Sequence, residues 1–258
     1  MKNVLHLEFR RLFRSKAFYI CILISLALIL ISAATSKLLL NAVNTEELPE
    51  GVNVSALMVP TGLSMMKGIG SSSVTMLLAV FVSLFVAEDY TSDTIKNIYS
   101  RGYSKTEVFV SKYIVTFVGC TIFIVATALF SLLIGSTFFE GMGSAGTNYV
   151  GSFLTILLCL VAYFTIYFAV AASLQRTGAS IGISIFGPMI VGLLFSLFSA
   201  MLKIDDVDLG DYWLTDRVTI LQQTNVAGKE IWIGCVIAVI VIAAGITIGY
   251  FLHKKKES

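Results

Sequence analysis

Six long apolar segments dominate this chain and constrain its fold more than any other feature. A helix needs about 20 mostly apolar residues to cross roughly 30 Å of hydrocarbon. The composition agrees, since 57% of the residues are hydrophobic and 13% are charged, whereas soluble domains have about 45–50% and about 25%. We therefore predict an all-α membrane protein. Its transmembrane helices are expected at 17–38, 72–87, 113–138, 149–174, 179–202 and 231–252.

The same composition excludes several classes of protein. Too little polar sequence remains for a soluble catalytic domain, a coiled coil, a disordered chain or a nucleic-acid-binding module. The four cysteines all lie in apolar segments and form no CxxC pair, which favours packing over metal binding or disulfides. The first segment is longer than the apolar core of a signal peptide, and five more segments follow. We therefore expect it to be retained.

The charges are distributed unevenly between the two sides of the predicted membrane. Thirteen of the 18 basic residues lie in the N-tail, the second and fourth loops and the C-tail. Ten of the 16 acidic residues lie in the other loops, so the net charges are about +7 and −5. Because loops rich in Lys and Arg stay in the cytoplasm, both termini are predicted to be cytoplasmic.

The middle of each apolar segment has no Asp, Glu, Lys, Arg or His. Ion-coupled carriers and pumps usually keep such residues there, although sodium sites made of backbone carbonyls stay open as an alternative. The two histidines, His6 and His253, lie in the tails, which excludes intramembrane proteolysis by a His-zinc or Ser-His site. The chain also lacks a GxxxxGK[ST] phosphate loop. Active transport would therefore need energy from another polypeptide.

The N-tail, residues 1–16, has the pattern of a basic amphipathic helix lying in the inner membrane interface. The alternative is that its positive charges only flank the first span. The apolar face would consist of Leu5, Phe9, Leu12 and Phe13, with Arg10, Arg11 and Arg14 mainly on the other faces.

The loop after the second segment, residues 88–112, has signals for a short helix and for the start of the next one. The short helix has an N-cap, an apolar face and a glycine at its C-terminal end. A capping box for the next helix follows. A plain solvated loop would need none of these. The residues are Ser92 or Asp93 (N-cap), Ile95, Ile98 and Tyr99 (apolar face), Gly102 (C-terminal glycine), and Ser104 with Glu107 (capping box).

This loop resembles the cytoplasmic loop of ABC-2 type (type V) exporter permeases. The sequence-specific part of the resemblance covers about 28 residues, and the general layout of the chain agrees with it. Asp93 departs from the glycine usual in that family, but an aspartate can cap the helix. The residues that carry the resemblance are Glu88, Asp93, Thr94, Ile95, Lys96, Ile98, Ser100, Arg101, Gly102, Ser104 and Lys112.

The resemblance implies that the loop is a coupling helix seated in a groove of a separate ATPase subunit. ATP and magnesium would bind to that subunit, so no cofactor, metal or catalytic residue is expected in this chain. A second permease subunit, identical or paralogous, would complete the transporter. The docking residues would be Asp93, Thr94, Ile95, Lys96, Ile98, Tyr99 and Arg101, and the residues that structure the loop would be Glu88, Gly102, Ser104 and Glu107.

The predicted function is export of hydrophobic or amphipathic cargo across a bacterial plasma membrane. Resemblance to small permeases of peptide export and lantibiotic immunity favours antimicrobial or toxic peptides. Lipophilic drugs or ions are alternative cargoes, and a non-transporting docking or sensor module is the alternative class, followed by a secondary transporter. Membrane lipid is an expected partner and nucleic acid is not.

The last external segment, residues 203–230, is expected to form short re-entrant helices, as the resemblance implies. Its acidic run lacks the glycine and glutamate of an EF-hand, so a solvated acidic face is favoured over a calcium site. Two GxxxG pairs predict close helix packing, and Gly187-Pro188 predicts a kink. The two pairs are Gly178 with Gly182 and Gly245 with Gly249.

Overall fold

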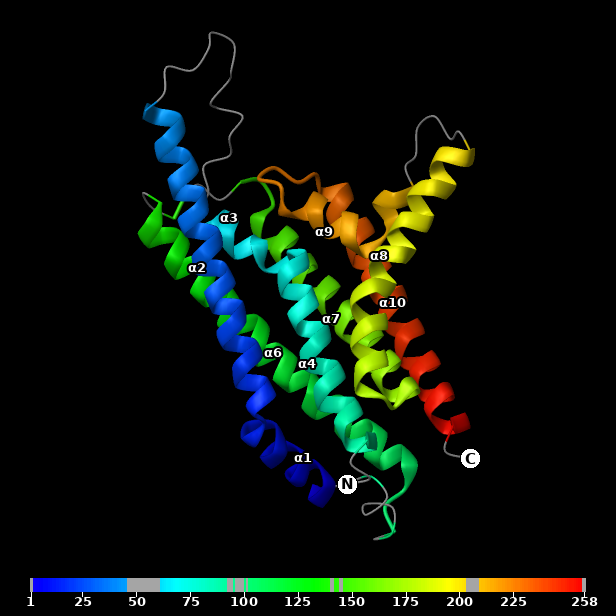
Figure 1. Ribbon diagram of the computed structural model, residues 1–258. Coiled ribbons are helices and arrows are strands. Elements are labelled where there is room, and N and C mark those ends of the chain that lie inside the picture. Colours follow the sequence, from blue (N-terminus) through cyan, green and yellow to red (C-terminus); the bar gives the residue numbers. More distant parts are fainter. Residues whose placement is uncertain are drawn as a thin grey trace.

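The protein is a bundle of helices in the computed structural model (Figure 1). No β-strand occurs among the residues that the structure describes. These are residues 2–45, 61–91, 95, 100, 102–139, 142–143, 146–202 and 209–256.

Six helices are long and apolar enough to cross a membrane, which confirms the predicted six-span, all-α fold. Shorter helices lie at the two ends of the bundle. The six long helices are α2 (Lys16–Thr45), α4 (Ser72–Thr91), α6 (Lys105–Phe138), α7 (Tyr149–Leu174), α8 (Thr177–Leu202) and α10 (Gly228–Lys256). The shorter ones are α1 (Lys2–Arg14), α3 (Gly62–Lys67), η2 (Gly68–Gly70), η3 (Leu209–Tyr212) and α9 (Leu214–Gln222).

Several helices extend beyond the apolar segments that predicted them. Helix α4 continues to Thr91 and α6 begins at Lys105, so both ends of the predicted loop 88–112 are helical. Hydropathy marks only the part of a helix that lies in lipid, whereas backbone hydrogen bonding continues into the polar residues beyond. Residues before the second span form α3 and η2 instead of extending α4, because an extended Ser71 separates η2 from α4.

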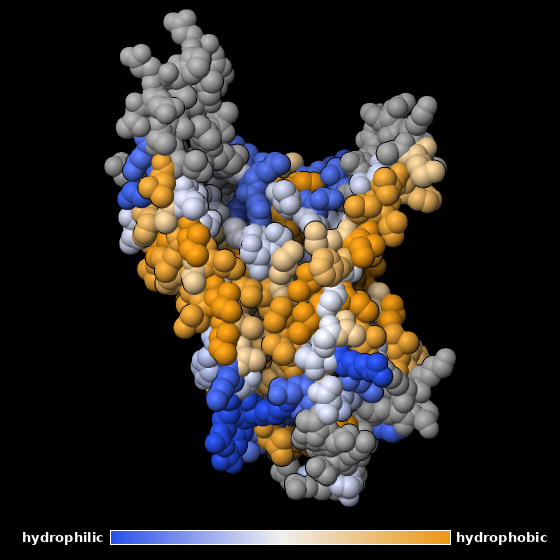
Figure 2. Space-filling view, viewed as in Figure 1, coloured by the Kyte–Doolittle hydropathy of each residue, from blue (hydrophilic) through white to orange (hydrophobic). Residues whose placement is uncertain are grey.

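Helices α4 and α7 form the centre of the bundle. Helix α7 packs against α4, α8, α9 and α10, and α4 also packs against α2 and α8. Most of α4 and α7 is buried, whereas α8 and α10 expose most of their apolar side chains. Figure 2 shows these exposed residues as an apolar band around the middle of the bundle, with hydrophilic residues gathered at both ends. This is the surface expected for a protein surrounded by lipid.

The two ends of the bundle have different elements. Both labelled termini, α1 and the connection between α4 and α6 lie at one end, which we call the α1 end (Figure 1). The short helices α3, η3 and α9 lie at the other end, the α9 end. The charge distribution predicts that the α1 end is cytoplasmic.

The two GxxxG pairs have different surroundings. A Cβ atom added to Gly245 would lie 2.8 Å from Thr165 Cγ2, and one added to Gly249 would lie 3.0 Å from Ala169 Cβ. This pair therefore allows α10 to pack closely on α7, as the sequence predicted. Among the described residues, a Cβ added to Gly178 or Gly182 would meet nothing within 4 Å apart from the nearby backbone of its own helix.

We expect Gly245→Leu to destabilise the protein and the matched variant Gly182→Leu to leave its stability almost unchanged. The leucine at 245 would push α10 away from Thr165, and overpacking of this kind costs about 1–3 kcal/mol. The midpoint of thermal unfolding in detergent is the measurement. Equal midpoints for the two variants would contradict the packing of α10 on α7.

Candidate functional site

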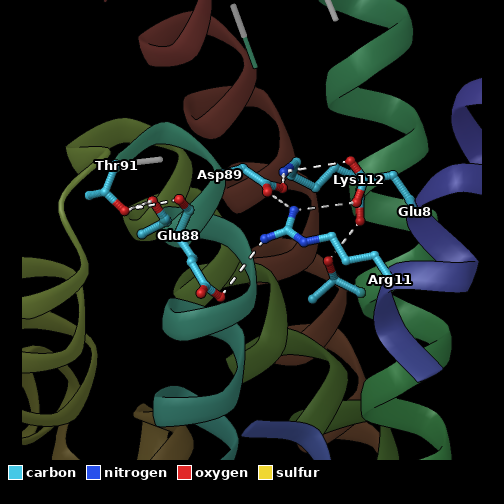
Figure 3. A network of polar contacts seen from close by, with 8 residues as sticks. Glu8, Arg11, Glu88, Asp89, Thr91 and Lys112 are labelled. Atoms are coloured by element: carbon cyan, nitrogen blue, oxygen red, sulfur yellow. Dashed lines mark hydrogen bonds and ion pairs between the residues drawn. The ribbon is translucent and has the colours of Figure 1, made fainter. Parts of the chain in front are cut away.

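Four charged side chains meet in the interior of the α1 end, and we call them the charge cluster: Glu8 and Arg11 of α1, Asp89 of α4 and Lys112 of α6 (Figure 3). Glu8, Asp89 and Lys112 are each 0–1% exposed, and the side chain of Arg11 is 26% exposed. Three elements that are distant in the sequence therefore contribute to one buried polar site. Buried charges are rare in proteins unless they are paired.

Asp89 is the centre of the charge cluster. Its Oδ1 atom forms an ion pair with Arg11 Nη1, and its Oδ2 atom accepts a hydrogen bond from Lys112 Nζ. Lys112 Nζ also lies 3.7 Å from Glu8 Oε1, and Arg11 Nη2 lies 3.9 Å from the exposed Glu88. Asp89 thus connects α4 with both α1 and α6.

Glu8 is held less tightly than Asp89. Neither of its carboxylate oxygens has a hydrogen-bond partner among the described residues, and its nearest cations are 3.7 Å and 4.0 Å away. Burial raises the pKa of Glu8 above its ordinary value, and the positive charge of Arg11 opposes this shift. Burial also lowers the pKa of Arg11, and Glu8 and Glu88 oppose that shift. The close ion pairs that hold the charge cluster together are therefore those of Asp89 with Arg11 and Lys112.

Aromatic rings cover the cations of the charge cluster. The guanidinium of Arg11 lies 5.4 Å from the centre of the Phe85 ring, and Lys112 Nζ lies 5.6 Å from that of Tyr90. Both rings belong to the last turns of α4. Cation–π contacts of this kind are stronger when the cation is desolvated, so they add to the attachment of α1 and α6 to α4.

Helix α1 has the predicted amphipathic character, but its inner face differs from the prediction. Arg11 turns toward the bundle instead of the lipid phosphates, whereas Phe13 is 50% exposed. Glu8 and Leu12 are buried, one turn apart on the inner face. Periodicity alone could not reveal this, because the partner of Arg11 lies 78 residues further along the chain.

The loop-structuring residues adopt the local structure that the sequence predicted. The hydroxyl of Ser104 accepts a hydrogen bond from the backbone N–H of Glu107, whose carboxylate accepts one from the N–H of Ser104. Gly102 has a φ angle of 83°, in the left-handed region that favours glycine. Glu88 lies in the last turn of α4 and takes part in the ion pair with Arg11.

The predicted docking residues are only partly described. Ile95 is helical and 4% exposed. Its direct contact with an ATPase remains a prediction. The other predicted docking residues, Asp93, Thr94, Lys96, Ile98, Tyr99 and Arg101, lie outside the described residues.

At the opposite end, Arg217 joins the short helices η3 and α9 to α10. Its side chain is 2% exposed, forms an ion pair with Glu230, and donates from Nε to the carbonyl of Asp211 at 2.8 Å. The sequence predicted short helices here, and η3 and α9 are short helices within this segment. Most of the acidic run lies outside the described residues.

Trp213 connects α9 to the proline of α8. Its indole N–H donates to the carbonyl of Pro188 at 2.8 Å, and its ring stacks on Phe195. Gly192 leaves room for the indole, since an added Cβ would lie 3.1 Å from Trp213 Cδ1. Proline removes one hydrogen bond from the ladder of α8, and Trp213 fixes the position of the helix at this point.

The described part of the chain has no group of three or more His, Cys, Asp or Glu residues that could hold a metal ion. Cys21, Cys120 and Cys159 are buried as free thiols, and Cys235 is partly buried. Both cations of the charge cluster are paired with Asp89. Its arrangement suits a mechanical role, because it fastens α1, α4 and α6 together beside the connection between α4 and α6.

A family model described as "ABC-2 family transporter protein" matches residues 4–203 of the chain. The match covers most of the chain, from α1 to the end of α8, and includes all four residues of the charge cluster. The chain therefore belongs to the ABC-2 transporter family, and it is a multi-pass membrane protein of the permease type. No curated protein matches it.

Proposed function

We propose that this permease is the membrane-spanning subunit of an exporter driven by ATP hydrolysis in a separate subunit. The observation that supports this proposal best is the charge cluster, which fastens α1 and α6 to the end of α4. Rigid attachment of three helices at this point is what a permease would need to receive force from a soluble motor. ATP and magnesium would bind only in that motor.

The distribution of charge in the chain supports an external source of energy. In the described chain, the buried charged side chains are those of the charge cluster at the α1 end, and Lys67 and Arg217 at the α9 end. None lies in the middle of a span, where ion-coupled transporters hold the coupling ion. A conformational change would therefore be driven from the end of the bundle and not from within the membrane.

The motor would act through the connection between α4 and α6. This connection continues directly into α4 on one side and into the capped start of α6 on the other. A displacement at the connection would move both helices, and the charge cluster would carry α1 with them. The docking contacts would come from the residues predicted for this role, which are Asp93, Thr94, Ile95, Lys96, Ile98, Tyr99 and Arg101.

Two permease subunits would form the pathway between them. The apolar face of α8 is exposed along its length, and Gly178 and Gly182 leave open space on it. Such a face suits close contact with a second helix. The second subunit would be a copy of this chain or a paralogue, and α4 and α8 would line the pathway in the plasma membrane of a bacterium.

Hydrophobic or amphipathic peptides are the cargo that we favour. The proposed pathway has no charged residue at its centre, so it would bind ions poorly. A cavity of about 350 Å³ lies among α4, α7, α8 and α9, and its wall includes Tyr163, Tyr167 and Thr215. Aromatic rings with hydroxyl groups suit an amphipathic chain better than a small ion. Lipophilic drugs are the second choice.

A pull-down of the tagged permease from detergent tests the docking of an ATPase. We expect the wild type to retain a polypeptide with a phosphate-loop motif, identified by mass spectrometry. Ile98→Asp would place a charge in the proposed interface and reduce retention by about tenfold or more. Lys229→Glu, an exposed change at the α9 end, is the control. Equal retention of the ATPase by Ile98→Asp and by the control would contradict the docking proposal.

Reconstitution of the complex in lipid vesicles tests transport itself. We expect added amphipathic peptide to stimulate ATP hydrolysis and to be moved across the membrane. A non-transporting docking or sensor module would hydrolyse ATP at the same rate with and without peptide. That outcome would reject the exporter even if the ATPase docks.

A further inference from the structure

A second polar site lies at the α9 end, away from the charge cluster. It adjoins the smaller cavity of the proposed pathway, because Ser71 and Gln222 line both. It is a cavity of about 800 Å³ bounded by α2, α3, α4 and the start of α7. This volume is typical of sites that hold a small organic ligand. Figure 2 shows hydrophilic residues between the outer ends of α2 and α8, above the apolar band. The hydroxyl groups that line the cavity belong to Ser25, Ser32, Ser36, Thr61, Ser64, Ser71, Ser73, Ser131 and Thr224.

Lys67, at the end of α3, provides a buried cation in the wall of this cavity. Its side chain is 2% exposed. The ammonium Nζ donates to the carbonyl of Gln223 at 2.9 Å and lies 5.1 Å from the centre of the Tyr149 ring. An ammonium has three N–H donors, so one carbonyl and one ring face leave part of its hydrogen-bonding capacity unused.

Lys67 differs from the other buried cations in the described chain. Arg11 and Lys112 pair with Asp89, and Arg217 pairs with Glu230. Lys67 has no carboxylate within ion-pair distance among the residues that the structure describes. Burial accordingly lowers the pKa of Lys67. A buried ammonium without a counter-charge is costly, and an anion bound beside it would remove most of that cost.

We propose that this cavity binds the anionic headgroup of an amphiphile, with the anion on Lys67. The hydroxyl group of Ser71 lines the same cavity and would donate a hydrogen bond to the anion's oxygens, whereas the hydroxyl groups of Thr61 and Ser64 donate within the N-terminal cap of α3. The apolar tail would lie along Leu28 and the other aliphatic residues of the cavity. Those residues are Leu28, Ile29, Ile31, Leu63, Val74 and Leu77.

The position of the tail follows from the exposure of α2. Leu28 and Ile31 line the cavity, yet they are 41% and 59% exposed. The wall formed by α2 therefore separates the cavity from the lipid only in part, and a tail could lie partly in the bilayer. The anion itself could be the phosphate of a lipid or the carboxylate of an acyl chain or peptide. Both offer a single negative headgroup on an apolar body.

Binding of matched amphiphiles to the purified full-length chain in detergent tests this proposal without any ATPase. Dodecanoate is compared with dodecanol, and phosphatidylglycerol with diacylglycerol, by native mass spectrometry and by the ligand-induced rise in unfolding temperature. We expect at least one anionic member to bind about tenfold tighter than its neutral match, because charge-assisted hydrogen bonds are the strong ones. The preferred pair identifies a carboxylate or a phosphate. Equal binding within both pairs would overturn the proposal.

Variants locate the anion. Lys67→Met keeps the length of the side chain and is expected to abolish the preference for the anion. Lys37→Met, an exposed lysine of α2, is the control and should keep it. Retention of the preference by Lys67→Met would place the anion elsewhere and overturn the assignment.

Two further variants test the tail channel and the carboxylates of the chain itself. Leu28→Trp fills the proposed tail channel from an exposed position, so it should weaken binding of anionic and neutral members alike by about tenfold. If Leu28→Trp binds as the wild type does, the cavity is not the site.

A chain with Glu46, Glu47 and Glu50 changed to Gln tests whether carboxylates of the chain itself form an ion pair with Lys67. Anion binding that occurs only in this triple variant would reject the proposal for the native protein.

Discussion

Replacing Asp89 by alanine is expected to destabilise the permease by about 3–5 kcal/mol, which is typical when one member of a buried ion pair is removed. Asp89 is fully buried and contacts both Arg11 and Lys112. Its loss would leave the two cations with only the more distant carboxylates of Glu8 and Glu88 to balance them. The free energy of unfolding, measured by titration with a denaturing detergent, should reveal the full effect.

Glu88→Ala is the matched control, because Glu88 is adjacent in the sequence but its side chain is 62% exposed. An exposed ion pair contributes about 0–1 kcal/mol, so this variant should unfold close to the wild type. A loss of stability in Glu88→Ala equal to that in Asp89→Ala would show that burial of the charge cluster does not set its energy.

The double variant Asp89→Ala, Lys112→Met separates stability from coupling. It removes one negative and one positive charge, so we expect it to regain part of the stability lost in Asp89→Ala. Under the proposed function it should still fail to respond to the ATPase, because α6 and α1 are no longer fastened to α4. Recovery of peptide-stimulated hydrolysis in the double variant would show that the cluster only stabilises the fold.

The second large effect is expected at Arg217, at the opposite end of the bundle. Arg217→Met would remove the ion pair with Glu230 and the hydrogen bond to the carbonyl of Asp211. Glu230 is 32% exposed, so its charge would remain partly hydrated, and the expected loss is about 1–3 kcal/mol. Faster hydrogen exchange of η3 and α9, measured by mass spectrometry, should accompany it.

Lys229→Met is the control for Arg217→Met, since Lys229 is an exposed neighbour of Glu230. It should change neither the unfolding midpoint nor the exchange of α9. If Arg217→Met leaves the exchange of α9 unchanged, the short helices are held at this end by other contacts, such as the bond between Trp213 and Pro188.

The sequence predicted the fold well because lipid imposes a simple rule on each span. Each apolar segment must satisfy its backbone hydrogen bonds internally, so length and hydropathy suffice to find the helices. The same rule could not place the helix ends, because Lys105 and Thr91 lie where water and lipid meet. The capping box of Ser104 and Glu107 was visible in the sequence, since its partners are only three residues apart.

The charge cluster could not be predicted in the same way. Lys112 and Glu88 belong to the loop pattern, but nothing local marks Asp89 or Glu8 as buried. The partners of Asp89, Arg11 and Lys112, lie on other helices. The two GxxxG pairs also show that spacing in the sequence does not reveal which residues are buried. They are identical in spacing, yet Gly245 packs against Thr165 whereas Gly182 faces open space. Which face of a helix is buried depends on its neighbours, and a single sequence does not contain that information.

The charge cluster has an electrical consequence. With Glu8 and Asp89 negative and Arg11 and Lys112 positive, its four formal charges cancel. Moving one elementary charge through the membrane voltage requires about 2.3 kcal/mol per 100 mV. A neutral cluster can shift along the membrane normal with almost no electrical work. The charge cluster itself would therefore add no voltage dependence to a transport cycle in which α1, α4 and α6 move together.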